Sequence, residues 1–121
     1  MLNEEVDDNE FLFRGVVDKN WDFENDRPTS ATFKDSKGVS VDRDGGRTEK
    51  ECINKINLVA DFHAVCKVRT KDVRKLSAIV LYKPIDENKF HSEIHDSLER
   101  IQMRGKKPSR IREKSIVVFL K

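Results

Sequence analysis

The stretch that most constrains this fold is residues 62–69, FHAVCKVR, in which the side chains divide between two faces with a period of two residues. That period is typical of a β-strand that is buried on one face. We therefore expect a strand here and a sheet around it. Its buried face is expected to carry Phe62, Ala64, Cys66 and Val68, and its second face His63, Val65, Lys67 and Arg69.

Four other stretches, rich in apolar and β-branched residues, predict further strands. They are residues 11–17, 38–42, 78–82 and 116–120. The run 78–82 is apolar throughout, which is typical of a central strand. The run 116–120 is apolar enough that we expect it to be buried on both faces.

Two main helices are predicted from apolar spacing and from a start signal. Thr48 followed by Glu51 matches a capping box and predicts a helix over about residues 48–58. Apolar residues at i, i+4 and i+7, counted from Ile94, predict an amphipathic helix over about residues 92–103.

The predicted elements do not alternate strictly between strand and helix, so we expect an α+β fold rather than a doubly wound parallel sheet. The fold is expected to contain a small mixed or antiparallel sheet with two main helices. A length of 121 residues fits a single domain. We place this domain at residues 11–121 and treat residues 1–10 as an acidic, loosely ordered N-terminal lead.

Composition excludes several classes of protein. Hydrophobic residues make up 36% of the chain and charged residues 38%, and no apolar run is long enough to span a membrane. The acidic start lacks the apolar core of a signal peptide. Cys52 and Cys66 form no CxxC pair, so we expect two buried free thiols. These features predict a cytoplasmic protein.

Charge is distributed unevenly, although the net charge is only +2. Residues 1–10 contain five acids and no base, whereas residues 99–114 contain seven bases and two acids. The basic stretch could be a solvated face, a surface that binds nucleic acid or a partner protein, or the place where the acidic lead docks. The candidate binding residues in it are Arg100, Arg104, Lys106, Lys107, Arg110 and Arg112.

The sequence HSEIH at residues 91–95 contains two of the three histidines. As a strand it would place His91, Glu93 and His95 on one face, and as a helix it would place the two histidines one turn apart. They could bind a metal, act as catalytic or ligand-binding groups, or be ordinary surface and capping residues. The spacing is not that of HExxH, and we predict no metal site.

Arg14 interrupts the apolar strand 11–17, where an unpaired charge is costly. It must face solvent, pair with a carboxylate, or lie in a cleft where it could bind an anionic group. A second candidate is the loop at residues 27–33 together with residues 38–43, because the irregular residues before it make a long loop and long ordered loops are disproportionately functional. The hydroxyl groups of these segments could bind phosphate or ribose groups, or could bond to their own backbone in turns. The candidate ligand-binding residues are Arg27, Ser30, Asp42, Arg43, His63 and His95.

Four segments together resemble a group of small bacterial proteins. They are LFRG at 12–15, RPTSATFK at 27–34, GVSVD at 38–42 and NKFHSEI at 88–94. More distantly, their layout is similar to RES-domain toxins and the ADP-ribosyltransferase-like fold. That resemblance implies NAD bound in a cleft between two small sheets.

The same resemblance implies roles for individual residues. Arg14 would bind the phosphates, and Ser40 would take the position of a hydroxyl residue that is Tyr in the RES pattern. Glu51 or Glu93 would be the acid that stabilises an oxocarbenium-like sugar.

Two functional hypotheses follow. In the first, the chain binds a nucleotide or NAD-like ligand, as a toxin or defence-type enzyme would, and Arg14, Ser40, Glu93 and one of His91 or His95 converge on one cleft. In the second, it is a non-enzymatic module that binds nucleic acid or a partner protein through residues 99–114. The positions of Arg14 and His91 relative to each other distinguish them.

Overall fold

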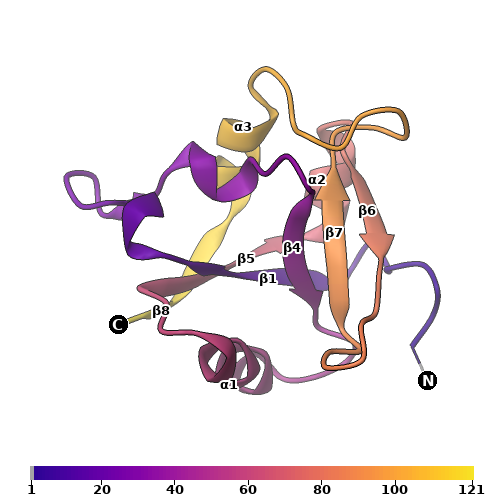
Figure 1. Ribbon diagram of the computed structural model, residues 1–121, viewed down its shortest axis with the longest axis horizontal. Coiled ribbons are helices and arrows are strands. Elements are labelled where there is room, and N and C mark those ends of the chain that lie inside the picture. Colours follow the sequence, from indigo (N-terminus) through magenta and orange to yellow (C-terminus); the bar gives the residue numbers. More distant parts are fainter. Residues whose placement is uncertain (1) are drawn as a thin grey trace.

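The computed structural model describes residues 2–121 and has one large antiparallel sheet as its frame (Figure 1). Six strands follow the order β6-β7-β4-β1-β5-β8, and each neighbouring pair is antiparallel. They are β1 (Phe11–Val16), β4 (Val39–Arg43), β5 (Ala64–Arg69), β6 (Ile79–Tyr82), β7 (His91–His95) and β8 (Ile116–Leu120).

The smaller elements are a two-stranded hairpin, three α-helices and two 3-10 helices. They are β2 (Trp21–Asp22) with β3 (Arg27–Pro28), α1 (Glu49–Val59), α2 (Thr70–Lys75), α3 (Lys107–Lys114), η1 (Asp18–Asn20) and η2 (Ser30–Phe33). The expected α+β class in a single domain is confirmed, and of the two alternatives for the main sheet, mixed or antiparallel, the structure has the antiparallel one. No α-helix within residues 2–121 is both long enough and apolar enough to cross a membrane.

Strand β5 confirms the predicted alternation from residue 64 onward. Ala64, Cys66 and Val68 belong to the main core cluster, and Val65 points to the opposite face. That second face is covered by α1, from which Glu49 forms an ion pair with Lys67 (Nζ to Oε1, 2.7 Å). The second face of β5 is therefore a packed helix interface.

Phe62 departs from this prediction. It precedes β5 and packs into the cluster beneath α1, on the side opposite Ala64. The expectation that Phe62 shares a face with Ala64 was therefore wrong, because the chain is not yet in the strand at that position.

Helix α1 begins where the capping box predicts. The hydroxyl of Thr48 accepts a hydrogen bond from the backbone N–H of Glu51, and the Glu51 carboxylate accepts one from the backbone N–H of Thr48. Its buried residues Cys52 and Ile56 pack against Phe13 and Val65 in the smaller core cluster. The helix is thereby fixed on one face of β1 and β5 (Figure 1).

Both thiols are buried and free, as expected. Burial raises the pKa of Cys52 to about 11 and that of Cys66 to about 12. Neither is a thiolate near neutral pH, so they act as small apolar side chains.

The main core lies on the other face of the sheet, between the strands and α3 with η2 (Figure 1). Phe33 from η2, Ile111 from α3 and Met103 from the preceding loop are almost fully buried there. Figure 1 also shows β4, β7 and β6 running across the direction of β1 and β5. The sheet is thus strongly twisted where β4 meets β1.

The predicted helix over residues 92–103 was wrong, and the strand alternative for residues 91–95 is the one that the structure adopts. Residues 91–95 form β7, which pairs with β4 on one side and β6 on the other. Ser92 and Ile94 are fully buried, whereas Leu98 is 83% exposed and Ile101 is 45% exposed. The apolar spacing was coincidental, because only Ile94 enters the core.

The expected positions of two apolar strands were also wrong. We expected β6 to be a central strand and β8 to be buried on both faces. They are instead the two edge strands of the sheet. In β8, Ile116 is 55% exposed and Leu120 is 51% exposed. Hydrophobicity identified these segments as strands without revealing their order.

The acidic segment packs against the domain through two arginines. Arg43, whose side chain is 3% exposed, donates to Glu10 from Nε (2.9 Å) and Nη2 (2.7 Å) and to the Asn3 carbonyl (2.6 Å). Arg74 pairs with Asp8, and Val6 is 1% exposed. Among the described residues, no ion pair joins this segment to residues 99–114, so within the chain its charges are paired with Arg43 and Arg74 and not with the basic stretch.

The buried Arg43–Glu10 pair should be critical for stability. Arg43→Met should lower the free energy of unfolding by about 3–5 kcal/mol, because the Glu10 carboxylate then stays buried without its partner. Urea denaturation followed by circular dichroism measures this loss. Arg27→Met is the control, since Arg27 is half exposed and 4.0 Å from Asp22, and should cost about 0–1 kcal/mol. Equal losses in both variants would contradict this assignment.

The same pair should make stability depend on pH. Burial alone would raise the pKa of Glu10, but hydrogen bonds from Arg43 and from two backbone N–H groups hold it below its ordinary value of 4.5. The pair therefore stabilises the fold above that value, and this contribution is lost as pH falls through the lowered pKa. Urea midpoints between about pH 3 and pH 7 should fall less steeply toward acid in Glu10→Gln than in the original chain. Identical slopes would argue against this coupling.

Candidate functional site

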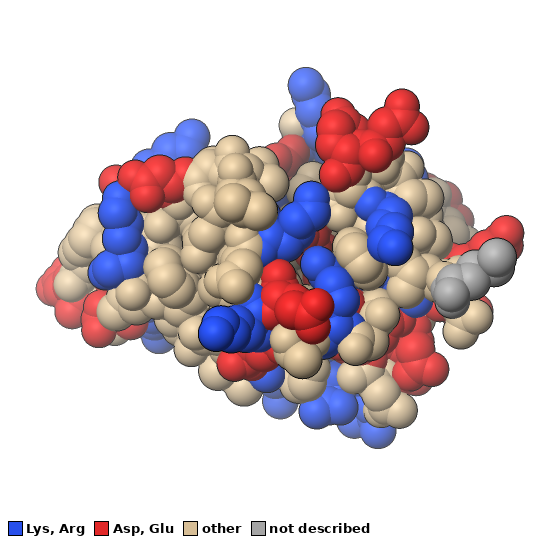
Figure 2. All heavy atoms as spheres, turned by 90° about the horizontal axis from the view of Figure 1, so that it is seen from below, with Lys and Arg blue, Asp and Glu red and all other residues tan. Residues whose placement is uncertain are grey.

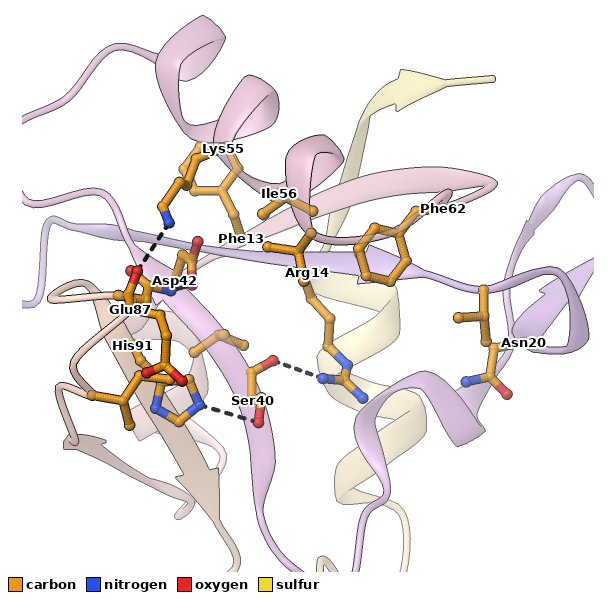
Figure 3. Close-up of a pocket in the computed structure, with 16 residues that line it drawn as sticks. Phe13, Arg14, Asn20, Ser40, Asp42, Lys55, Ile56, Phe62, Glu87 and His91 are labelled. Carbon is orange, nitrogen blue, oxygen red and sulfur yellow. Dashed lines mark hydrogen bonds between the residues drawn. The ribbon is translucent and has the colours of Figure 1, made fainter.

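A pocket of about 490 Å³ opens between α1, the strands β1 and β4, and the segment that leads into β7 (Figure 3). Apolar side chains line one part of it: Phe13, Val17, Val41, Ile56, Val59, Phe62 and Ile85. Polar and charged side chains line the rest: Arg14, Asn20, Ser40, Asp42, Asn88 and His91, with Lys55 and Glu87. Such a mixture in a cavity of this size is characteristic of small-molecule sites.

The pocket exists because β1 and β4 separate. They pair only at Leu12 with Arg43 and at Phe13 with Asp42, whereas β1 pairs with β5 along six residues. Past Phe13 the gap is bridged by the Arg14 side chain, which donates from Nη1 to the Ser40 carbonyl (2.7 Å) and from Nε to the Thr32 carbonyl (2.7 Å). The guanidinium thus donates to one carbonyl of β4, beyond the paired residues of β1, and to one carbonyl of η2.

Of the three environments expected for Arg14, the structure shows the cleft. Its partners there are two backbone carbonyls and no carboxylate. Burial lowers the pKa of the guanidinium below its ordinary value. An arginine nevertheless keeps its proton in proteins, so the pocket wall contains a permanent positive charge.

Gly15, the next residue of β1, lets an aromatic ring lie against the strand. A β-carbon at this position would be 2.6 Å from ring atoms of Phe62. The absence of a side chain on Gly15 therefore allows Phe62 to form part of the apolar wall.

Ser40 and His91 form a hydrogen-bonded pair inside the pocket (Figure 3). Nδ1 of His91 lies 2.8 Å from the Lys83 carbonyl, and Nε2 lies 3.3 Å from the Ser40 hydroxyl. Because a carbonyl only accepts, Nδ1 must carry a proton, and Nε2 of the neutral ring is then an acceptor. The Ser40 hydroxyl accordingly donates to His91.

Asp42 also faces the pocket and is held by a turn residue. Its carboxylate accepts a hydrogen bond from the Asn88 side-chain amide Nδ2 (2.7 Å), and the side-chain oxygen Oδ1 of Asn88 accepts one from the backbone N–H of Phe90 (3.0 Å). At the rim, Lys55 donates to the backbone carbonyl of Glu87 (3.3 Å). The pocket thus combines both charge signs with amide and hydroxyl groups.

Four of the predicted site residues converge here: Arg14, Ser40, Asp42 and His91. The aromatic wall and the polar residues Asn20, Lys55 and Asn88 were not among the predicted site residues. These come from a 3-10 helix, a helix and a turn, and no spacing in the sequence links them. Only the NKFHSEI segment drew attention to the region of Asn88.

Glu93 and His95 lie on the same strand as His91 but form a separate cluster. His95 Nε2 lies 2.8 Å from Glu93 Oε1, and Lys83 lies 3.9 Å from the same carboxylate. Gly38, at φ +100°, leaves room for them, because a β-carbon there would be 2.8 Å from atoms of both. Neither residue lines the pocket, and Glu51, the other acid implied by the resemblance, belongs to the capping box.

The other predicted ligand-binding residues lie elsewhere. His63 packs against Trp21 and Phe23 and is 3.3 Å from Asp18, while Arg43 is bound to Glu10. Arg27 belongs to the β2–β3 hairpin and Ser30 to η2. None of the four lines the pocket.

The basic stretch is partly neutralised within the chain. Arg104 and Lys107 form ion pairs with the fully buried Asp96 (3.3 and 3.2 Å). The side chains of Arg100, Lys106 and Arg110 are exposed. Figure 2 shows, on the face seen from below, basic and acidic side chains interspersed rather than gathered into one large patch.

Within residues 2–121, no group of three or more histidine, cysteine, aspartate or glutamate side chains is arranged to hold a metal ion. Comparisons with protein-family models, with curated proteins and with solved structures found no match to this chain. The resemblance to RES-domain and ADP-ribosyltransferase-like proteins therefore stays a prediction.

Removing the Arg14 bridge should destabilise the fold. Arg14→Met leaves the carbonyls of Thr32 and Ser40 without their donor, at a cost of about 1–3 kcal/mol for each that stays buried. Arg14→Lys should give an intermediate loss, because an ammonium can reach one carbonyl but lacks the planar fork. Urea denaturation measures both. A change of less than about 0.5 kcal/mol in Arg14→Met would show that water replaces the bridge without penalty.

Proposed function

We propose that this chain binds a nucleotide or NAD-like ligand in the pocket between α1 and β4. The observation that supports it most is the convergence of Arg14, Ser40 and His91, from three different strands, beside an apolar wall. Polar groups that meet at one end of an apolar cavity are the usual arrangement of a small-molecule site. Had Arg14 and His91 been on opposite faces, this proposal would have failed.

The chemistry of the lining matches the parts of a nucleotide. Phe13, Phe62 and Ile56 offer the apolar surface that a base needs. Asp42 and Asn88 offer an acceptor and an amide for the polar edge of a base or the hydroxyls of a ribose. Arg14 and Lys55 are the two cations available to phosphate oxygens.

The alternative function, binding of nucleic acid through residues 99–114, has less support. Two of its six candidate residues, Arg104 and Lys107, form ion pairs with Asp96. Nucleic-acid affinity depends on the number of phosphates that the protein neutralises, so a stretch that loses two cations to an internal acid is a weaker candidate.

Lys55 provides a direct test, since it is the pocket cation that can be removed without touching the sheet. Isothermal titration with AMP, ATP and NAD should detect binding of at least one ligand. Lys55→Met should weaken binding about 10- to 100-fold, because a charged hydrogen bond contributes about 1.5–3 kcal/mol.

The matched control is Lys50→Met, which removes an exposed lysine from the same helix outside the pocket. It should leave affinity unchanged. Absence of binding for all three ligands, or equal losses in the two lysine variants, would refute the proposal. If NAD binds, chromatography of an incubated sample for released nicotinamide tests the toxin-type activity that the resemblance implies.

A further inference from the structure

Ser40 has the surroundings of an activated nucleophile. It lies in β4 with its residue exposed, so a substrate can reach its hydroxyl from the pocket. A serine hydroxyl is a weak nucleophile by itself and needs an adjacent base that removes its proton. The only partner of the Ser40 hydroxyl within residues 2–121 is Nε2 of His91, at 3.3 Å.

His91 is held in the orientation and the tautomer that a base requires. Its Nδ1–H donates to the Lys83 carbonyl (2.8 Å), which leaves the lone pair of Nε2 directed at Ser40. In serine–histidine catalysis a third group orients the imidazole in this way. Here that group is a backbone carbonyl at the end of β6, so its position is set by the sheet.

Arg14 places a positive charge beside this pair. Its Nη1 is bonded to the carbonyl of Ser40 itself, and Nε to that of Thr32, so the guanidinium cannot move far from the nucleophile. Nη2 makes no hydrogen bond within the described chain. A fixed donor of this kind is suited to an oxygen on which negative charge develops.

We propose that Ser40 and His91 form a nucleophile–base pair that hydrolyses carboxylic esters. The proposal uses the same pocket as the proposed function but does not require that a nucleotide bind there. Phe13, Ile56 and Phe62 would contact the apolar acyl group, which predicts a preference for butyrate or benzoate esters over acetate esters.

The first half of the reaction forms an acyl-enzyme. The Ser40 oxygen attacks the ester carbonyl carbon as its proton passes to His91 Nε2, and the carbonyl electron pair moves onto the oxygen beside Arg14. The oxyanion then re-forms the carbonyl, the bond to the alcohol oxygen breaks, and the alcohol departs with the proton from His91. In the second half, water attacks in the same manner and releases the carboxylic acid and free Ser40.

Covalent labelling tests this assignment. A fluorophosphonate probe should modify Ser40, with the mass of the adduct located by peptide mass spectrometry. His91→Asn can still donate to the Lys83 carbonyl but is no base, and it should slow labelling about 100-fold or more. Ser30, an exposed serine outside the pocket, is the internal reference and should stay unmodified.

Hydrolysis of p-nitrophenyl butyrate gives a second readout that does not depend on the folding of His91→Asn. Ser40→Ala should abolish hydrolysis, whereas Ser30→Ala should leave the rate unchanged. No adduct on Ser40, labelling of Ser30 at the same rate, or activity retained in Ser40→Ala would each overturn the inference.

These outcomes are separable from those of the proposed function. If nucleotides bind and Ser40 is not labelled, the proposal of ester hydrolysis is refuted and the proposal of nucleotide binding is retained. Labelling of Ser40 and hydrolysis without nucleotide binding refute the nucleotide proposal and retain the catalytic pair.

Discussion

The bridge that Arg14 forms between the carbonyls of Ser40 and Thr32 is the interaction on which the rest of this structure depends. Adjacent strands normally form backbone hydrogen bonds with each other. Where two strands separate, backbone carbonyls are left without a donor. The guanidinium supplies a donor to the Ser40 carbonyl of β4 and to the Thr32 carbonyl of η2, so β4 can turn away from β1 with its Ser40 carbonyl still bonded. The pocket occupies the space thus opened. One side chain therefore stabilises the divergence of the sheet and lines the site that the divergence creates.

Helix α1 and the strands β4 and β7 form the walls of this site. α1 packs through Cys52 and Ile56 over one half of the sheet and forms a wall of the pocket beside β4. On β4 and β7 the residues Ser40 and His91 face the pocket, while Ile94 points to the main core and Val41 belongs to that core and also borders the pocket. Because successive residues of a strand point to opposite faces, the same two strands supply both the core and the reactive pair.

Local signals in the sequence predicted most of the helices and strands, but they did not predict the order of the strands in the sheet. The capping box at Thr48 and the alternation at residues 64–69 involve neighbours in the chain, and both were correct. Ile94 was misassigned to a helix because an apolar residue at helical spacing does not reveal whether its partners will be buried. The apolar strands β6 and β8 became edges, while β1 and β4, which contain Arg14 and Asp42, took central places.

The sequence by itself determined that this chain forms an α+β domain, that Arg14 needs a special environment within its strand, and that Ser40, Asp42 and His91 are chemically suitable for a site. Only the tertiary structure decided which of the candidates meet. Glu93 and His95 pair with each other, and His63 packs against Trp21, although all three were as plausible by residue type. The physical reason is that strand register and the separation of β1 from β4 are set by contacts between residues distant in the chain, which no local pattern encodes.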